Sequence, residues 1–136
     1  MTRYVEHEHQ KALIRWALRA RLPAAPDITP GATVSAYLLA IPNGGQRSPR
    51  EAARLRAEGV KAGVSDLLFP IPRQGKAGLW IELKAPKGRP TPAQREWLEK
   101  MSAAGYVAEW RDDWTAAANL IANYVGMPTP YPELPK

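Results

Sequence analysis

The sequence contains no cysteine, and this absence excludes disulfide bonds, zinc ribbons and a thiol nucleophile. Any metal ion must therefore be held by oxygen or imidazole ligands. The sequence also has no apolar run near the roughly 18 residues that a membrane span needs. Its first residues, MTRYVEHEHQ, lack the charged-then-apolar order of a secretion signal. We therefore expect a cytoplasmic protein without a membrane partner.

Acidic residues are the minority among the charged ones. Nineteen Lys and Arg oppose thirteen Asp and Glu, which gives the 136 residues a net charge of +6. Such a balance favours polyanionic partners such as nucleic acids, although basic side chains are often only solvated. The length suits one domain. We expect residues 1–126 to form this domain and residues 127–136, which include four prolines, to form an extended tail.

Hydrophobic periodicity, together with the positions of Pro and Gly, predicts alternating helices and strands. Helices are expected at residues 4–21, 48–59, 91–105 and 112–126. Strands are expected at residues 34–42, 65–71, 78–85 and 106–110. The second and third strands, joined by PRQGKAG, are typical of an antiparallel hairpin. This order predicts an α/β protein in which helices flank a mixed β-sheet.

Charged residues interrupt the apolar pattern of that hairpin. Glu82 and Lys84 are two residues apart in a strand and so share one face, opposite Ile81 and Leu83. A buried charge is costly unless it is paired or binds a metal, so these residues indicate a site. If the strand of Asp66 pairs alongside, its carboxylate reaches the same pocket. Two carboxylates suit Mg²⁺ or Mn²⁺, and the backbone carbonyl of Leu83 offers a further ligand.

Such a set of groups is suited to phosphodiester hydrolysis. A divalent ion binds a phosphate oxygen and lowers the pKa of a bound water, while a neighbouring lysine orients that water or neutralises charge. Glu6 would add a carboxylate that either binds a second metal ion or activates the water, because its helical face, shared with Gln10 and Ile14, should point inward. Glu8 remains an alternative, since the first turn of a helix frays. The simpler interpretation is a chance ion pair on a strand, with Asp66 as a turn residue.

Several spaced elements together resemble a known family. The segments EHEHQKALIRWA, GVSDLLFPIP and GLWIELKAPKGRPTPAQREWLEKMSAAGY are similar to the VRR-NUC domain, the virus-type replication-repair nuclease branch of the PD-(D/E)XK superfamily. The resemblance covers roughly residues 4–125 and implies a restriction-endonuclease-like core. It also implies the following roles: Asp66 and Glu82 as metal ligands, Lys84 as the catalytic lysine, Glu6 as the first-helix acid and Gln94 as the family's glutamine on the next helix.

Two short segments extend the comparison with this family. PNGG, with Asn43 and Gly44, resembles the loop ahead of the family's second helix. Ser65 stands where the pattern usually has proline before the aspartate, a departure that removes no ligand. Basic and polar side chains around the site are expected to contact phosphates. These candidates are Lys61, Arg73, Lys76, Lys87, Arg89 and Asn43.

The resemblance implies a Mg²⁺- or Mn²⁺-dependent DNA endonuclease that is structure-specific for branched or junction DNA, in the manner of a Holliday-junction resolvase. The family is linked to DNA repair, and stand-alone copies look like phage proteins, so the expected location is the cytoplasm of a phage-infected or bacterial cell. A symmetric homodimer would suit paired cuts at a four-way junction. Two alternatives remain, namely an inactive DNA-binding module with the same fold and an RNA nuclease.

Overall fold

A four-stranded mixed β-sheet forms the centre of the computed structural model, which describes residues 2–42 and 48–128, with side chains from residue 5 onward. The strands, in their order across the sheet, are β1 (Leu39–Ala40), β2 (Leu67–Phe69), β3 (Leu79–Leu83) and β4 (Val107–Arg111). The pairs β1–β2 and β2–β3 are antiparallel, whereas β3–β4 is parallel. The expected α/β class with a mixed, helix-flanked sheet is confirmed.

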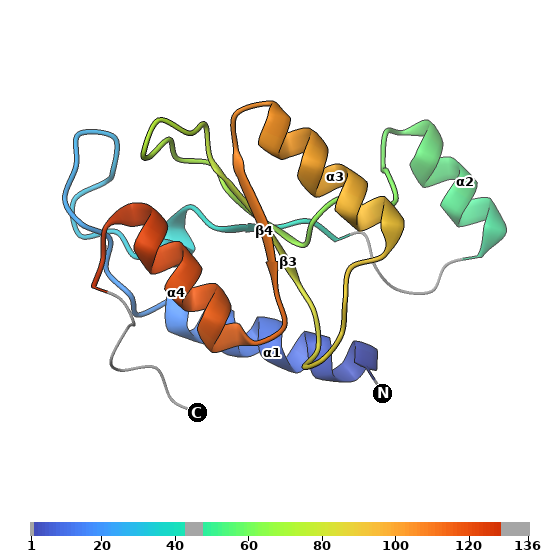
Figure 1. The fold of residues 1–136 in the computed structure, drawn as a ribbon, viewed down its shortest axis with the longest axis horizontal. Helices are drawn as coiled ribbons and strands as arrows, with labels where there is room; N and C mark the ends of the chain where they lie inside the picture. Colours follow the sequence, from blue (N-terminus) through green and yellow to red (C-terminus); the bar gives the residue numbers. More distant parts are fainter. Residues whose placement is uncertain (1, 43–47, 129–136) are drawn as a thin grey trace.

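Helices cover both faces of this sheet (Figure 1). On one face, α1 (Thr2–Ala17) and α4 (Trp114–Val125) pack against each other and against β3. On the other face, α3 (Pro92–Ala103) packs against β3 and β4. The short α2 (Pro49–Ala57) projects from one end of the molecule and has no buried residue. Within the described part of the chain, no helix is both long and apolar enough to cross a membrane.

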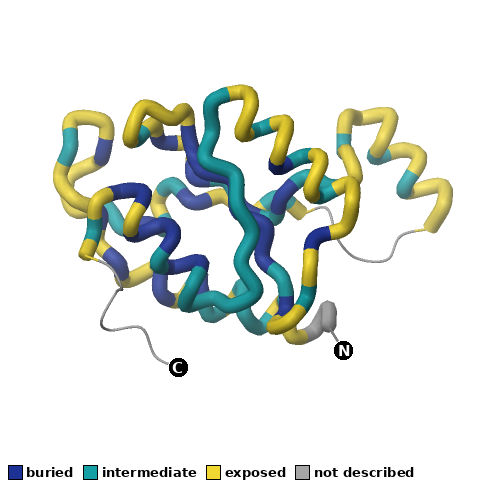
Figure 2. Tube along the Cα trace, viewed as in Figure 1, coloured by how far each residue is buried: buried dark blue, intermediate teal, exposed yellow. Residues whose placement is uncertain are grey.

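The pleat of β3 separates the apolar core from the face that carries the charged residues. All five residues of β3 are buried, and the strand runs dark blue through the middle of Figure 2. Its odd-numbered residues belong to the main hydrophobic core. Trp80 instead meets Trp97 of α3 edge to face, with ring centroids 5.3 Å apart. Because alternate residues of a strand share a face, Glu82 projects on the same side as Trp80.

Residues 34–42 do not form the single strand that their β-prone pattern predicts. Val34–Ala36 form a 3₁₀ helix, η1, and only Leu39–Ala40 join the sheet. The carbonyl of Val34 accepts hydrogen bonds from the amides of Tyr37 and Leu38. Val34 and Leu38 are both buried, and a helical turn brings residues four apart to one side, whereas an extended strand would separate them along its length.

The first helix ends at Ala17 and not at the predicted Arg21, which instead forms an isolated β-bridge with Thr33. Ala20 and Leu22 are both buried, so the chain leaves the helical path to place them in the core. The other helices and the β2–β3 hairpin begin and end within two residues of their predicted bounds. The predicted tail at residues 127–136 lies, from residue 129 onward, outside the described residues.

Candidate active site

Asp66 and Glu82 are neighbours across the β2–β3 hairpin. The antiparallel register, continued one residue beyond β2, places Asp66 opposite Glu82. The backbone of Asp66 is held by its carbonyl, which accepts a 2.7 Å hydrogen bond from the amide of Ile41. Its side chain is held by Oδ2, which accepts a 2.9 Å hydrogen bond from the amide of Leu83. The carboxyl group of Asp66 is therefore fixed against the strand that carries Glu82.

Burial changes the protonation of this carboxyl pair. The side chain of Glu82 is 2% exposed, and burial together with the negative charge of Asp66 raises the pKa of Glu82 to about 9. Burial also raises the pKa of Asp66, whereas hydrogen bonds with the Leu83 amide and with Glu82 act in the opposite direction. At neutral pH the metal-free pair therefore holds a proton on Glu82.

Lys84 places a positive charge beside the carboxyl pair. Its Nζ lies 4.0 Å from Oε2 of Glu82, 3.6 Å from Oε2 of Glu6 on α1 and 3.4 Å from Oε1 of Gln94 on α3. The side chain of Lys84 is only 12% exposed. The ammonium group thus links β3 to a helix on each face of the sheet.

Glu6 faces the site, and Glu8 does not. The side chain of Glu6 is 27% exposed and contacts Lys84. The side chain of Glu8 is 42% exposed and forms a 3.1 Å ion pair with Lys11 of the same helix. The carboxylate of Glu6 thus lies beside the ammonium of Lys84. It does not form a three-residue metal site with the carboxyl pair, because the described residues contain no group of three His, Cys, Asp or Glu side chains placed to hold one metal ion. A metal site here would depend on Asp66 and Glu82 as its two carboxylates.

The Asp66–Glu82 pair has the donor chemistry that a hard divalent cation requires. Oε1 of Glu82 is buried and has no hydrogen-bond partner among the described residues. An unpaired buried oxygen of this kind costs about 1–3 kcal/mol, and two facing carboxylates repel each other when both are ionised. A divalent cation would remove both penalties, and all-oxygen donors suit Mg²⁺ or Mn²⁺. The residues present therefore fit such an ion.

Gln94 reaches Lys84 from the first turn of α3, which a capping box holds in place. The hydroxyl of Thr91 accepts a 3.2 Å hydrogen bond from the backbone amide of Gln94. In return, the side-chain oxygen Oε1 of Gln94 accepts a 2.8 Å hydrogen bond from the backbone amide of Thr91. Gly63, on the segment before Asp66, has a φ of +88°, and a Cβ at this position would lie 2.7 Å from the carbonyl oxygen of Ala93. This close approach fixes the start of α3 beside the carboxyl pair.

Comparison with known proteins agrees with this geometry. A family model for the VRR-NUC domain matches residues 6–110, from Glu6 through the carboxyl pair and Lys84 to Trp110. The chain belongs to the VRR-NUC family. A solved structure described as a VRR_NUC domain protein has 30% sequence identity and a TM-score of 0.72, with 90% of this chain and 89% of that chain covered. A search of curated proteins found no match. The VRR-NUC match implies a nuclease-type fold and confirms the resemblance seen in the sequence.

Three of the basic residues predicted to contact phosphates lie on segments that flank the VRR-NUC site. Lys87 and Arg89 are exposed in the loop between β3 and α3. The amide of Lys87 donates a 3.1 Å hydrogen bond to Oδ2 of Asp112, which holds this loop against the chain after β4. Lys61 is exposed on the segment that leads to β2. The side chains of all three residues are therefore exposed to solvent on these segments.

The other predicted phosphate contacts are not brought to this site. Arg73 and Lys76 lie in the turn at the opposite end of the β2–β3 hairpin from the carboxyl pair. The guanidinium of Arg73 also forms two hydrogen bonds, of 2.7 and 2.8 Å, with the carboxylate of Asp27. This pairing joins the hairpin turn to the loop after α1. Asn43 lies outside the described residues.

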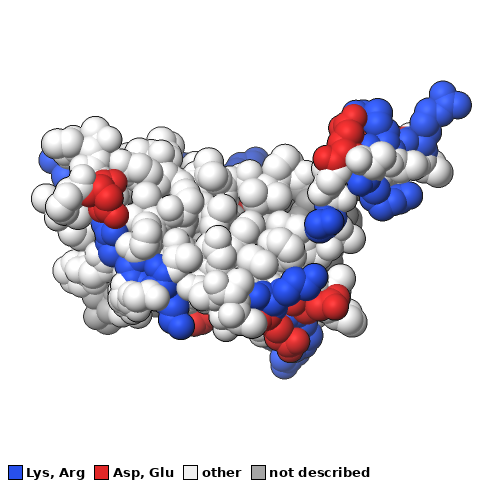
Figure 3. Space-filling model, turned by 90° about the horizontal axis from the view of Figure 1, so that it is seen from above, with Lys and Arg blue, Asp and Glu red and all other residues white. Residues whose placement is uncertain are grey.

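The projecting helix α2 adds a second basic surface to the VRR-NUC domain. Arg50, Arg54 and Arg56 are exposed on it, and Arg54 forms a 3.3 Å ion pair with Glu58. Figure 3 shows charged side chains gathered on this projection, at one end of the molecule. The helix therefore presents exposed cations on a projection at one end of the molecule.

A contact between α1 and α4 could not be predicted from the sequence. Nδ1 of His9 accepts a 3.0 Å hydrogen bond from the amide of Trp114, 105 residues away in the chain. The side chain of Asp113 accepts a hydrogen bond from the amide of Thr115. His9 thereby joins Asp113 in satisfying the first amides of α4 and holds α1, the helix of Glu6, in place. No local signal indicates this role, because the two partners meet only in the folded chain.

Proposed function

We propose that this VRR-NUC protein is a divalent-metal-dependent endonuclease that hydrolyses phosphodiester bonds in branched or junction DNA. The proposal is carried by one observation, the buried Asp66–Glu82 carboxyl pair with the ammonium of Lys84 4.0 Å from Glu82. Family membership supports a nucleic acid as the substrate. A carboxyl pair buried at this cost beside a cation has a chemical rationale in metal binding and phosphate hydrolysis.

In this proposal the carboxylates of Asp66 and Glu82 hold Mg²⁺ or Mn²⁺, with the carbonyl of Leu83 as a further oxygen ligand. When bound, the ion would withdraw charge from a phosphate oxygen and lower the pKa of a water molecule. The ammonium of Lys84 neutralises negative charge that develops on the phosphate. Glu6 and Gln94 hold this ammonium in place, since each contacts Nζ.

The distribution of positive charge supports a branched substrate. The chain carries a net charge of +6, and its exposed cations lie on separate surfaces, including the loop after β3 and the projecting α2. Separate basic surfaces suit a nucleic acid whose arms leave the site in several directions. We propose DNA as the substrate and a symmetric homodimer as the form that makes paired cuts.

The test is a cleavage assay on several substrates. Supercoiled plasmid, a splayed arm and a four-way junction, the last two made as DNA and as RNA, are incubated with Mg²⁺, Mn²⁺ or EDTA. We expect cutting of the junction DNA that requires the metal. Lys84→Ala should abolish cutting while DNA binding survives, because Lys84 acts on the reacting phosphate. Lys100→Ala, at an exposed position of α3, is the matched control and should cut normally.

The other outcomes separate the competing functions. Binding without cutting under every metal condition would contradict the nuclease proposal and favour an inactive DNA-binding module. Cutting of the RNA junction in preference to the DNA junction would reassign the substrate. Equal cutting of plasmid and junction would refute the preference for branched DNA.

A further inference from the structure

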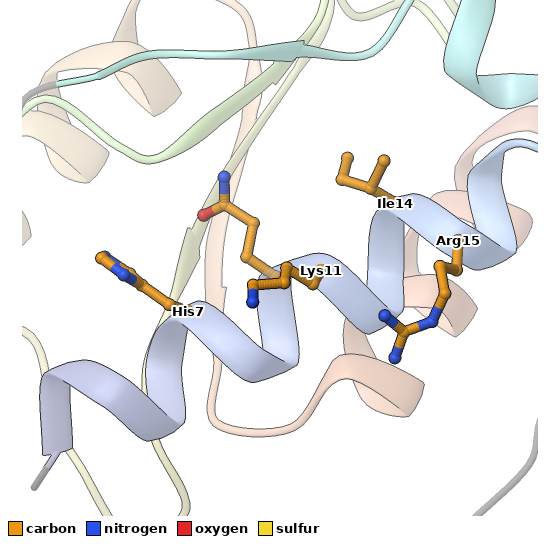
Figure 4. A pocket seen from close by; sticks show the side chains of 5 residues that line it. His7, Lys11, Ile14 and Arg15 are labelled. Carbon is orange, nitrogen blue, oxygen red and sulfur yellow. The ribbon is translucent and has the colours of Figure 1, made fainter.

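A groove of about 530 Å³ lies along α1 (Figure 4). Among the described residues, its lining consists of His7, Gln10, Lys11, Ile14 and Arg15. A volume of this size lies within the range of about 300–1,000 Å³ that is typical of ligand sites. None of these five side chains belongs to the carboxyl pair or its contacts. The groove is therefore a separate feature that the proposed chemistry does not explain.

The lining residues form two rows along the helix, each with a spacing of four residues. Gln10 and Ile14 continue the row of Glu6, whose carboxylate lies 3.6 Å from Nζ of Lys84. Four residues of an α-helix rise about 6 Å. The groove thus begins within one turn of Glu6, which contacts the proposed catalytic lysine, and continues along α1 towards Arg15. A chain bound in the groove would lead directly to the site.

The second row gives the groove a positive flank. His7, Lys11 and Arg15 are all exposed, and Figure 4 shows them in succession along the helix. No acidic residue lines the groove within the described part of the chain. Lys11 pairs with Glu8, but both side chains are exposed, by 64% and 42%. An ion pair of this kind is worth about 0–1 kcal/mol, so Lys11 can exchange its partner for a phosphate.

The floor of the groove is suited to a chain that carries both charged and less polar groups. Ile14 is partly buried and packs against the hydrophobic core, so it presents a fixed apolar surface. Gln10 adds an amide that can both donate and accept hydrogen bonds. Phosphates on the positive flank and sugars over the apolar floor match this arrangement. A nucleic-acid strand has both components in regular alternation.

We propose that this groove binds the phosphodiester backbone of the substrate strand next to the scissile phosphate. Lys11 and Arg15 bind phosphates of the strand, and Gln10 positions the backbone between them and Glu6. The identity of the strand as substrate rests on the proposed nuclease function. The assignment of the groove as a binding surface depends on its volume, its positive charge and its continuity with the row of Glu6.

The test compares two variants that each remove two exposed positive charges. Lys11→Gln/Arg15→Gln alters the groove, and Lys76→Gln/Lys100→Gln alters the hairpin turn and α3. Binding of a fluorescent four-way junction and of its single strands is measured by anisotropy in EDTA at a series of KCl concentrations. The groove variant should bind about 10-fold more weakly. The slope of log K against log salt is negative, and its magnitude, the salt slope, should fall by about 1.5, or about 0.7–0.9 for each lost contact.

Two further measurements guard against a folding effect. Urea unfolding should give the same midpoint for both variants as for the wild type, because the exchanged side chains are exposed. Lys11→Arg/Arg15→Lys keeps both charges and should restore the wild-type salt slope. A groove variant whose slope equals that of the wild type, or falls no more than that of the control variant, overturns the proposal. A wild-type protein that binds none of the nucleic acids overturns it as well.

Cleavage with Mg²⁺ or Mn²⁺ is measured on the same proteins, so that the two proposals can fail separately. If the wild type cuts but the groove variant keeps its slope, the groove assignment is wrong and the nuclease proposal stands. If the wild type never cuts but the groove variant loses its slope, the nuclease proposal is wrong and the groove stands as a nucleic-acid-binding surface.

Discussion

Glu82 should make the metal-free protein less stable as the pH rises. The folded protein keeps the carboxyl group of Glu82 buried against Asp66, which raises its pKa to about 9 from an ordinary value of 4.5. The unfolded chain exposes the same group to water and releases its proton near the ordinary value. Replacing Glu82 with Gln removes the titration and keeps the shape of the protonated side chain.

The magnitude follows from the number of protons that each state holds. Below about pH 4.5 Glu82 is protonated in both states, so its contribution to stability is fully present there, and it is lost as the pH rises through about 9. Within this window the free energy of unfolding falls by about 1.4 kcal/mol per pH unit. The loss between about pH 6 and pH 8 is therefore about 3 kcal/mol.

The other carboxyl groups with shifted pKa values do not oppose the effect of Glu82 in this pH range. Asp27 and Asp113 have lowered pKa values, so the stability they contribute is lost only as the pH falls below their ordinary value of 3.8. Burial raises the pKa of Asp66, so the stability that Asp66 contributes is also lost as the pH rises above its ordinary value of 3.8. None of these three carboxyl groups therefore reverses the slope that Glu82 gives between about pH 6 and pH 8.

Urea unfolding in EDTA, followed by tryptophan fluorescence from pH 5 to pH 8, measures this effect. Glu82→Gln should flatten the profile and be more stable than the wild type at the alkaline end. Glu96→Gln, at an exposed position of α3, is the control and should retain the wild-type slope. A wild-type free energy of unfolding that stays constant or rises across this range would refute the reasoning, as would equal slopes for the wild type and Glu82→Gln.

Three further predictions concern the surroundings of the carboxyl pair. Gly63→Ala should destabilise the protein by more than about 2 kcal/mol, because its Cβ would meet the backbone of Ala93. Gly59→Ala, at a position with positive φ but open space, should cost only about 1 kcal/mol. Equal losses of the free energy of unfolding, measured in urea, would contradict this. Thr91→Ala removes the side-chain cap of α3 and should lower the free energy of unfolding by about 1 kcal/mol, while an unchanged value would show that the cap contributes little. Saturating Mn²⁺ should raise the thermal midpoint of the wild type and leave that of Asp66→Asn unchanged, and an equal rise in both would place the ion elsewhere.

The face of each candidate residue could be predicted from the sequence, because it depends on local geometry. The two-residue period of a strand puts Glu82 and Lys84 on one side, and the helical period directs Glu6 inward. The hairpin pattern brings the segment of Asp66 alongside. These rules operate over a few residues and hold wherever the element forms. The metal and catalytic roles of these residues remain predictions for the assays above.

Long-range pairing decided what these local patterns could not. Arg73 was a candidate for phosphate contact from its charge alone, yet its guanidinium is held by Asp27, 46 residues away in the chain. The β-prone segment from Val34 onward contributes only a two-residue strand, because Val34 and Leu38 must both enter the core. Neither outcome depends on neighbours in the sequence, so no local pattern reports it.

The sequence by itself determined where the helices begin, which residues form the hairpin and which side chains share its charged face, since caps, turns and periodicity act between near neighbours. Only the tertiary structure decided the protonation of Glu82, because its raised pKa arises from the burial and from the charge of Asp66 on another strand.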